Sequence, residues 1–105
     1  MVIIETSIFT RQVTAILTDQ EYKGLQEALV SRPTLGDVIV GSGGLRKVRW
    51  SGQGRGKRGG TRVIYYWATR QDQLLMLFIY SKNQRDDLSQ SQLKTLHRII
   101  EIEYP

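Results

Sequence analysis

Hydrophobic positions along the chain change their spacing twice, and each spacing indicates a different kind of element. Apolar residues recur at helical intervals from about Ser7 to Pro33, which predicts two amphipathic helices in succession. From Leu45 to Tyr80 the pattern becomes alternating or continuously apolar, as is typical of strands. Helical spacing returns after Ser89. With a short strand at the N-terminus, the expected order is strand, two helices, three strands and a helix.

Two capping boxes mark where two of these helices begin. Thr18-Asp19-Gln20-Glu21 and Ser89-Gln90-Ser91-Gln92 each place a hydroxyl three residues before a Glu or Gln. In this arrangement the two side chains satisfy amides that the first helical turn leaves without partners. The first box opens a helix that ends near Pro33. The second opens a final helix with an apolar inner side formed by Leu93, Leu96 and Ile100.

The three later strands are predicted over residues 45–50, 61–68 and 74–80. The last of these is almost continuously apolar, so we expect it to be a central strand covered on both faces. With helices on one side of a mostly antiparallel sheet, the predicted class is α+β, with the other sheet face open. No repeat or linker divides the chain, and residues 1–105 are expected to form a single domain.

Alternation along the strands separates two sets of side chains. It places Val48 toward the helices and Lys47 and Arg49 on the opposite side. In the following strand one set consists of Arg62, Ile64 and Tyr66, and the other of Val63, Tyr65 and Trp67. Alternation alone does not decide which of these sets shares a face with the basic residues.

Composition excludes several classes of chemistry. The 105 residues contain no cysteine, which excludes disulfides, thiolate catalysis and the common structural zinc sites. His97 is the only histidine and lies among apolar residues of the last predicted helix, so we expect neither a metal nor a cofactor. No apolar run approaches the roughly 20 residues of a membrane span, and the N-terminus lacks the features of a signal peptide. A cytoplasmic protein without membrane contacts is expected.

Basic residues are concentrated in one part of the chain. The net charge is +5, yet no acidic residue lies between Asp37 and Asp72, a segment that holds eight of the fifteen Lys and Arg residues. A merely solvated surface normally mixes signs, whereas a concentration of one sign favours a polyanionic partner such as nucleic acid.

A glycine-rich segment, residues 51–60, lies within this basic region. Gly54, Gly56 and Gly59 match the spacing of a dinucleotide-binding motif, but that motif requires a helix to follow and here a strand is predicted. We interpret the segment as a basic hairpin loop that contacts RNA phosphates; the alternative is a loop that binds nothing. Its cationic residues are Arg55, Lys57 and Arg58.

The neighbouring strands offer candidates for RNA chemistry. RNA is cut without a metal when its own 2′-OH attacks the adjacent phosphate, which needs a base and cations for the developing charge. Crowding by Arg46 and Arg49 makes Lys47 a candidate base, and the planar fork of Arg62 suits phosphate. Spacing alone does not separate this chemistry from passive phosphate binding. Two aromatic residues are candidates for stacking on unpaired bases, Tyr66 and Tyr80.

Four stretches, residues 44–49, 56–66, 79–83 and 87–89, resemble the HigB-type members of the RelE/ParE toxin superfamily. The resemblance covers essentially the whole chain. It implies a ribosome-dependent endoribonuclease that enters the A site of the small ribosomal subunit, contacts rRNA, cleaves mRNA and arrests translation. Carried over by position, its catalytic residues are Lys47, Arg49, Arg62 and Lys82, with Arg85 as a less certain RNA-binding neighbour.

The same resemblance implies a partner. A helix-turn-helix antitoxin would neutralise the toxin, and DNA would be contacted only through that antitoxin. The RelE subgroup carries a tyrosine near the start of the last helix, where this chain has Leu88 and Ser89, so the general base is left open. Two other functions are also left open: a ParE-like inhibitor of DNA gyrase and a non-catalytic protein that binds RNA or the ribosome.

Overall fold

The structure, a computed structural model, describes residues 1–50, 60–82 and 87–105. The strand predicted over 61–68 is confirmed at both ends, and the other predicted elements are found within a few residues of their expected bounds. One strand was not predicted, because two residues are too few to display an alternating pattern. The elements are β1 (Val2–Glu5), α1 (Ser7–Ile16), α2 (Asp19–Ser31), β2 (Asp37–Val38), β3 (Arg46–Trp50), β4 (Thr61–Ala68), β5 (Gln73–Ser81) and α3 (Gln90–Glu103).

Both predicted capping boxes are present. The Thr18 hydroxyl accepts a hydrogen bond from the amide of Glu21, whose carboxylate accepts one from the Thr18 amide. Ser89 and Gln92 make the same pair of bonds at the start of α3. These caps stabilise the first turns of the helices and determine where the chain leaves the preceding loops.

The strands form one sheet in the order β1-β5-β4-β3-β2. The pairs β2–β3, β3–β4 and β4–β5 are antiparallel, and β1 alone runs parallel to its neighbour β5. The expectation of a mostly antiparallel α+β sheet is therefore confirmed. Among the described residues, no helix is both long enough and apolar enough to cross a bilayer.

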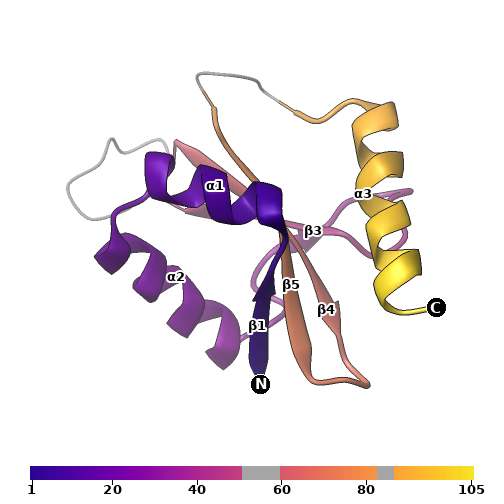
Figure 1. Ribbon diagram of the computed structural model, residues 1–105, viewed down its shortest axis with the longest axis horizontal. Coiled ribbons are helices and arrows are strands. Elements are labelled where there is room, and N and C mark those ends of the chain that lie inside the picture. The colour runs from indigo at the N-terminus through magenta and orange to yellow at the C-terminus, as the bar shows by residue number, and fades with distance from the viewer. Residues whose placement is uncertain (51–59, 83–86) are drawn as a thin grey trace.

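The helices lie on both faces of the sheet, which corrects the prediction that they would share one side (Figure 1). One core joins α1 and α2 to Val48, Val63 and Met76, and a second joins α3 to Ile64 and Leu77. The last helix is amphipathic in the same way as the first two, and its sequence does not encode which face it covers. As a result, the face expected to be open is partly covered by α3.

A bulge in β5 directs two successive apolar side chains into the core beneath α3. Ile64 pairs with Phe78 and Tyr65 pairs with Met76, so Leu77 has no partner residue in β4. The extra residue breaks the alternation, and Leu77 and Phe78 both contribute to the core beneath α3. Because helices cover both faces of β5, the strand is apolar at almost every position, whereas a strand covered on one face would alternate.

Tyr65 anchors the chain that leads into β2. Its hydroxyl donates to the carbonyl of Pro33 at 2.6 Å and accepts from the amide of Gly36 at 2.9 Å. A side chain on Gly36 would place its Cβ 2.8 Å from the Tyr65 ring and 3.0 Å from the Lys47 carbonyl, so only glycine fits here. This close contact holds β2 against the start of β3, where the candidate site begins.

A candidate nucleic-acid interface on β3 and β4

Three basic side chains project from one face of neighbouring strands. Arg49 lies directly opposite Arg62, and Lys47 lies opposite Ile64, whose side chain packs in the core beneath α3. Residues opposite one another in a pair, and alternate residues of a strand, point to the same face. Lys47, Arg49 and Arg62 therefore share the α3 face of the sheet, which settles the question that alternation left open.

This grouping works against stability. Like charges directly opposite one another on paired strands are unfavourable, and Arg62 is only 5% exposed. Local conflicts of this kind are expected at functional sites.

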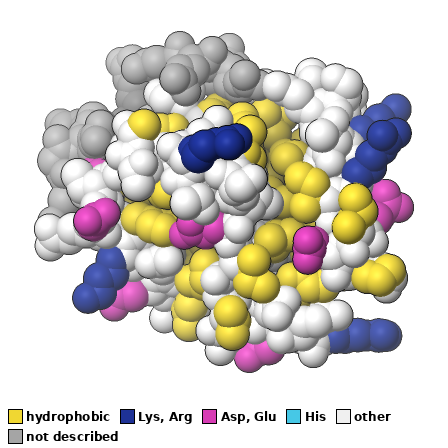
Figure 2. All heavy atoms as spheres, viewed as in Figure 1, with side chains coloured by type: hydrophobic (Ala, Val, Ile, Leu, Met, Phe, Trp, Pro, Cys, Tyr) yellow, Lys and Arg dark blue, Asp and Glu magenta, His cyan; other side chains and the backbone are white. Residues whose placement is uncertain are grey.

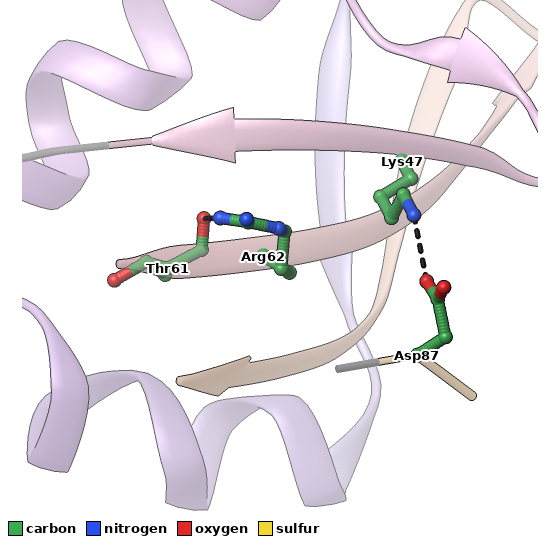
Figure 3. Close-up of polar contacts among 4 residues, drawn as sticks. All are labelled: Lys47, Thr61, Arg62 and Asp87. Atoms are coloured by element: carbon green, nitrogen blue, oxygen red, sulfur yellow. Dashed lines mark hydrogen bonds and ion pairs between the residues drawn. The ribbon is translucent and has the colours of Figure 1, made fainter. Parts of the chain in front are cut away.

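Asp87 lies within this cationic group. Its carboxylate accepts a hydrogen bond from the Lys47 ammonium at 2.8 Å, as Figure 3 shows. The hydrogen bond and charge of Lys47, and then the charges of Arg62 and Arg49, hold the pKa of this carboxyl below its usual value. Asp87 thus ties the segment before α3 to Lys47 through a hydrogen bond, and it also feels the charges of Arg62 and Arg49.

From the sequence, Asp86 and Asp87 are expected to serve only the N-terminus of the last predicted helix, which they precede. The contact of Asp87 with Lys47 corrects that interpretation for Asp87. Helix α3 begins at Gln90 and has no acidic residue in its first turn. The signal that the sequence offered was indirect: Asp87 follows the segment 38–71, which contains no acid that could balance its cations. Asp86, the other half of the acidic pair, lies outside the described residues.

The low pKa of Asp87 gives a prediction for solution. Lys47→Ala removes the main cause of the shift, so the Asp87 pKa is expected to rise toward that of an ordinary aspartate. Carboxyl-carbon NMR titrations of the wild type and the variant measure this change. Lys94→Ala, a truncation at an exposed lysine on α3, serves as the control and should leave the Asp87 titration unchanged. An equal Asp87 pKa in the wild type and Lys47→Ala would contradict the ion pair.

The structure places two other predicted basic residues differently from one another. Arg46 points to the opposite face, where its guanidinium donates to the carbonyl of Gly36 at 2.8 Å. It therefore does not crowd Lys47, and the charged neighbour that Lys47 does contact is a carboxylate. Lys82 directly follows β5, and its backbone amide bonds the carbonyl of Gly60, at the end of the sheet where Arg62 lies.

The two aromatic candidates differ in their accessibility. Tyr66 lies on the same face as Arg62, is half-buried and packs 5.9 Å from the ring of Tyr104. Tyr80 pairs with Arg62 across β4 and β5 but is only 2% exposed, so the core covers its ring. Stacking on a base is open to Tyr66 as the structure stands, whereas Tyr80 would first have to leave the core.

Four predicted RNA-binding residues lie outside the described residues: Arg55, Lys57, Arg58 and Arg85.

A groove of about 590 Å³ lies beside β2 and β3, and its lining includes Lys47, Arg49 and Trp50. Figure 2 shows a different side of the molecule, where hydrophobic side chains gather between α1 and α3 and basic ones are scattered. Within the part of the chain that the structure describes, no cluster of three potential metal ligands occurs.

A family model described as the RelE toxin of the RelE/RelB toxin–antitoxin system matches residues 5–102. The chain belongs to the RelE toxin family. As a RelE toxin it is one component of a toxin–antitoxin pair. The match does not test the HigB subtype, which stays a prediction.

Two solved structures of Escherichia coli RelE have the same fold. The isolated toxin has a TM-score of 0.61 at 10% sequence identity, over 93% of this chain and 97% of that one. A free arginine-to-alanine double mutant of the same toxin has a TM-score of 0.60 at 11% identity, over 92% and 93%. These identities are too low for the likeness to reach beyond the fold.

Proposed function

We propose that this RelE toxin is an endoribonuclease that cleaves mRNA in the ribosomal A site and so inhibits translation. The single observation that carries the proposal is the group of cations formed by Lys47, Arg49 and Arg62 on one face of the sheet. Family membership supports it, since a toxin needs a cellular target and translated RNA is a polyanion. The HigB branch remains the subgroup that the sequence resembles most.

The reaction we propose needs only the RNA and protein side chains. The 2′-oxygen attacks the adjacent phosphorus, the bond to the 5′-oxygen breaks, and a 2′,3′-cyclic phosphate and a 5′-hydroxyl result. Negative charge grows on the phosphoryl oxygens as the new bond forms, and fixed cations stabilise it. Arg62 is the most buried of the three, so packing restricts where its planar fork of donors can lie.

The surroundings of the site suit a single strand of RNA. Arg49 and Lys47 line the groove beside β3 and are available to phosphates along an extended backbone. Tyr66 offers a partly exposed ring on the same face, and Lys82 follows the neighbouring strand. We propose these residues as contacts to mRNA or rRNA, together with the basic residues of the 51–60 segment.

The partners follow from the same proposal. The protein would act in the cytoplasm, where mRNA is translated, and a cognate helix-turn-helix antitoxin would neutralise it. The antitoxin would make any DNA contacts of the complex. No metal or cofactor is required by the proposed reaction.

The test is brief induction in bacteria followed by primer extension on an abundant mRNA. A matched copy of that mRNA without its start codon is not translated and serves as the control. We expect cuts within the coding region of the translated copy and none in the control. Equal cuts in both copies would overturn ribosome dependence. Growth arrest without cuts, but with breaks in chromosomal DNA, would indicate a gyrase inhibitor instead.

A further inference from the structure

We propose that Asp87 and Lys47 form a proton-transfer pair, in which Asp87 accepts the proton of the attacking 2′-OH and Lys47 protonates the leaving 5′-oxygen. This inference rests on the proposed RNA cleavage and adds roles for two residues within it. It departs from the sequence-based interpretation, in which crowding by Arg46 and Arg49 made Lys47 the candidate base.

The contacts of Lys47 favour the role of an acid. Its ammonium is 2.8 Å from the Asp87 carboxylate, and Arg46 lies on the other face of the sheet. In this hydrogen bond the ammonium of Lys47 is the donor, and an ammonium carries a proton that it can transfer to a leaving oxygen. The side chain of Lys47 is 28% exposed, so it is fixed by packing yet open toward a ligand.

Asp87 is suited to be the base because it is ionised and open to the ligand. Its side chain is 72% exposed, and it lies where a phosphate would be attracted by Lys47, Arg49 and Arg62. In the free protein these cations weaken it as a base. A bound phosphodiester would interact with the same cations, so that they stabilise the Asp87 carboxylate less, and it would add negative charge nearby. Both changes raise the carboxyl pKa. The base therefore becomes stronger when RNA is bound.

Over one catalytic cycle, Asp87 and Lys47 return to their starting protonation states without exchanging protons with any other group. Asp87 gains a proton as the bond between the 2′-oxygen and phosphorus forms, and Lys47 loses one as the bond to the 5′-oxygen breaks. After the products leave, the neutral carboxylic acid and the neutral amine are again hydrogen-bond neighbours. One proton passes from Asp87 to Lys47 and restores the starting ion pair. No other acid, base or metal is needed.

The experiment compares two short mRNAs on programmed ribosomes in single-turnover reactions. One has the natural bridging 5′-oxygen at the cleaved bond, and the other has sulfur there. A thiolate leaves without being protonated, so the second substrate does not need a general acid. We expect Lys47→Ala to be slow on the oxygen substrate and restored toward the wild-type rate on the sulfur substrate. Asp87→Asn should be slowed about 100-fold or more on both substrates.

Two further readouts separate catalysis from a structural role. The wild-type rate should rise with pH along an acidic limb as the bound-state carboxyl ionises, and Asp87→Asn should lose that limb. Asp87→Glu keeps a carboxylate and should recover part of the rate, whereas Glu27→Gln on the exposed side of α2 should leave the rate unchanged. Thermal unfolding of each variant establishes that it is folded.

Distinct outcomes would overturn this inference or the function on which it rests. If Asp87→Asn cleaves as fast as the wild type, the carboxylate is not the base. If the sulfur substrate restores Asp87→Asn as it restores Lys47→Ala, then Asp87 only positions the lysine. If the wild type cuts neither substrate, the proposed nuclease function itself fails.

Discussion

Arg62→Ala is expected to lower the rate of RNA cleavage about 10²- to 10³-fold, the range found when one preorganised donor to a developing oxyanion is removed. Arg62 is 5% exposed, so its guanidinium is held in place before the substrate arrives. No reorganisation is then needed when charge develops on the phosphoryl oxygens. Single-turnover cleavage of a short mRNA on programmed ribosomes measures the effect, and growth after induction gives an independent readout.

The variant Arg62→Lys tests whether cleavage needs the planar guanidinium or only a positive charge at this position. It keeps the positive charge but replaces a planar fork of donors with a flexible point charge, so we expect a rate between those of the wild type and Arg62→Ala. Arg11→Ala removes an exposed arginine from α1 and should leave cleavage unchanged. Because Arg62 is buried, the melting temperature of each variant must be measured alongside. Full cleavage activity in a folded Arg62→Ala variant would contradict the assigned site.

Leu77→Ala is expected to give the largest loss of stability, about 2–5 kcal/mol in the free energy of unfolding, as is typical of buried leucines. The side chain is fully buried in the core between the sheet and α3. Urea unfolding monitored by circular dichroism measures the difference.

Val40→Ala is the matched control for this truncation. Val40 is 92% exposed, so its replacement should change the unfolding free energy by less than about 0.5 kcal/mol. If Leu77→Ala costs no more than Val40→Ala, then α3 does not pack on the sheet as described. The site would be affected as well, because α3 and the segment before it carry Asp87 to the sheet.

Under the proposed function, the basic residues on the α3 face of the sheet are arranged for binding an anion. Arg49 and Arg62 face one another across paired strands, and two like charges in such positions repel each other. Asp87 offsets part of that repulsion in the free protein. In our proposal, a bound RNA phosphate adds a second negative charge beside the same cations. The cations would then interact with the Asp87 carboxylate in the free protein and with the substrate in the complex.

Local features of this protein are readable in its sequence because their causes are local. The capping boxes at Thr18 and Ser89 involve residues three positions apart, and both predicted helix starts are correct. The strand over 61–68 was predicted to the residue because β-branched and aromatic side chains dominate it from Thr61 to Trp67. Alternation also placed Val48 and Lys47 on opposite faces, as the structure confirms.

Only the tertiary structure decided the features that depend on distant contacts. The amphipathic pattern of α3 is satisfied by either face of the sheet, and packing on Leu77 and Ile64 selected one. A one-residue bulge reversed the alternation in β5, and a periodic pattern cannot reveal such an insertion. Asp87 and Lys47 are 40 residues apart in sequence, so their contact follows from the docking of α3. The sequence by itself determined which side chains carry charge, and the fold determined which of them meet.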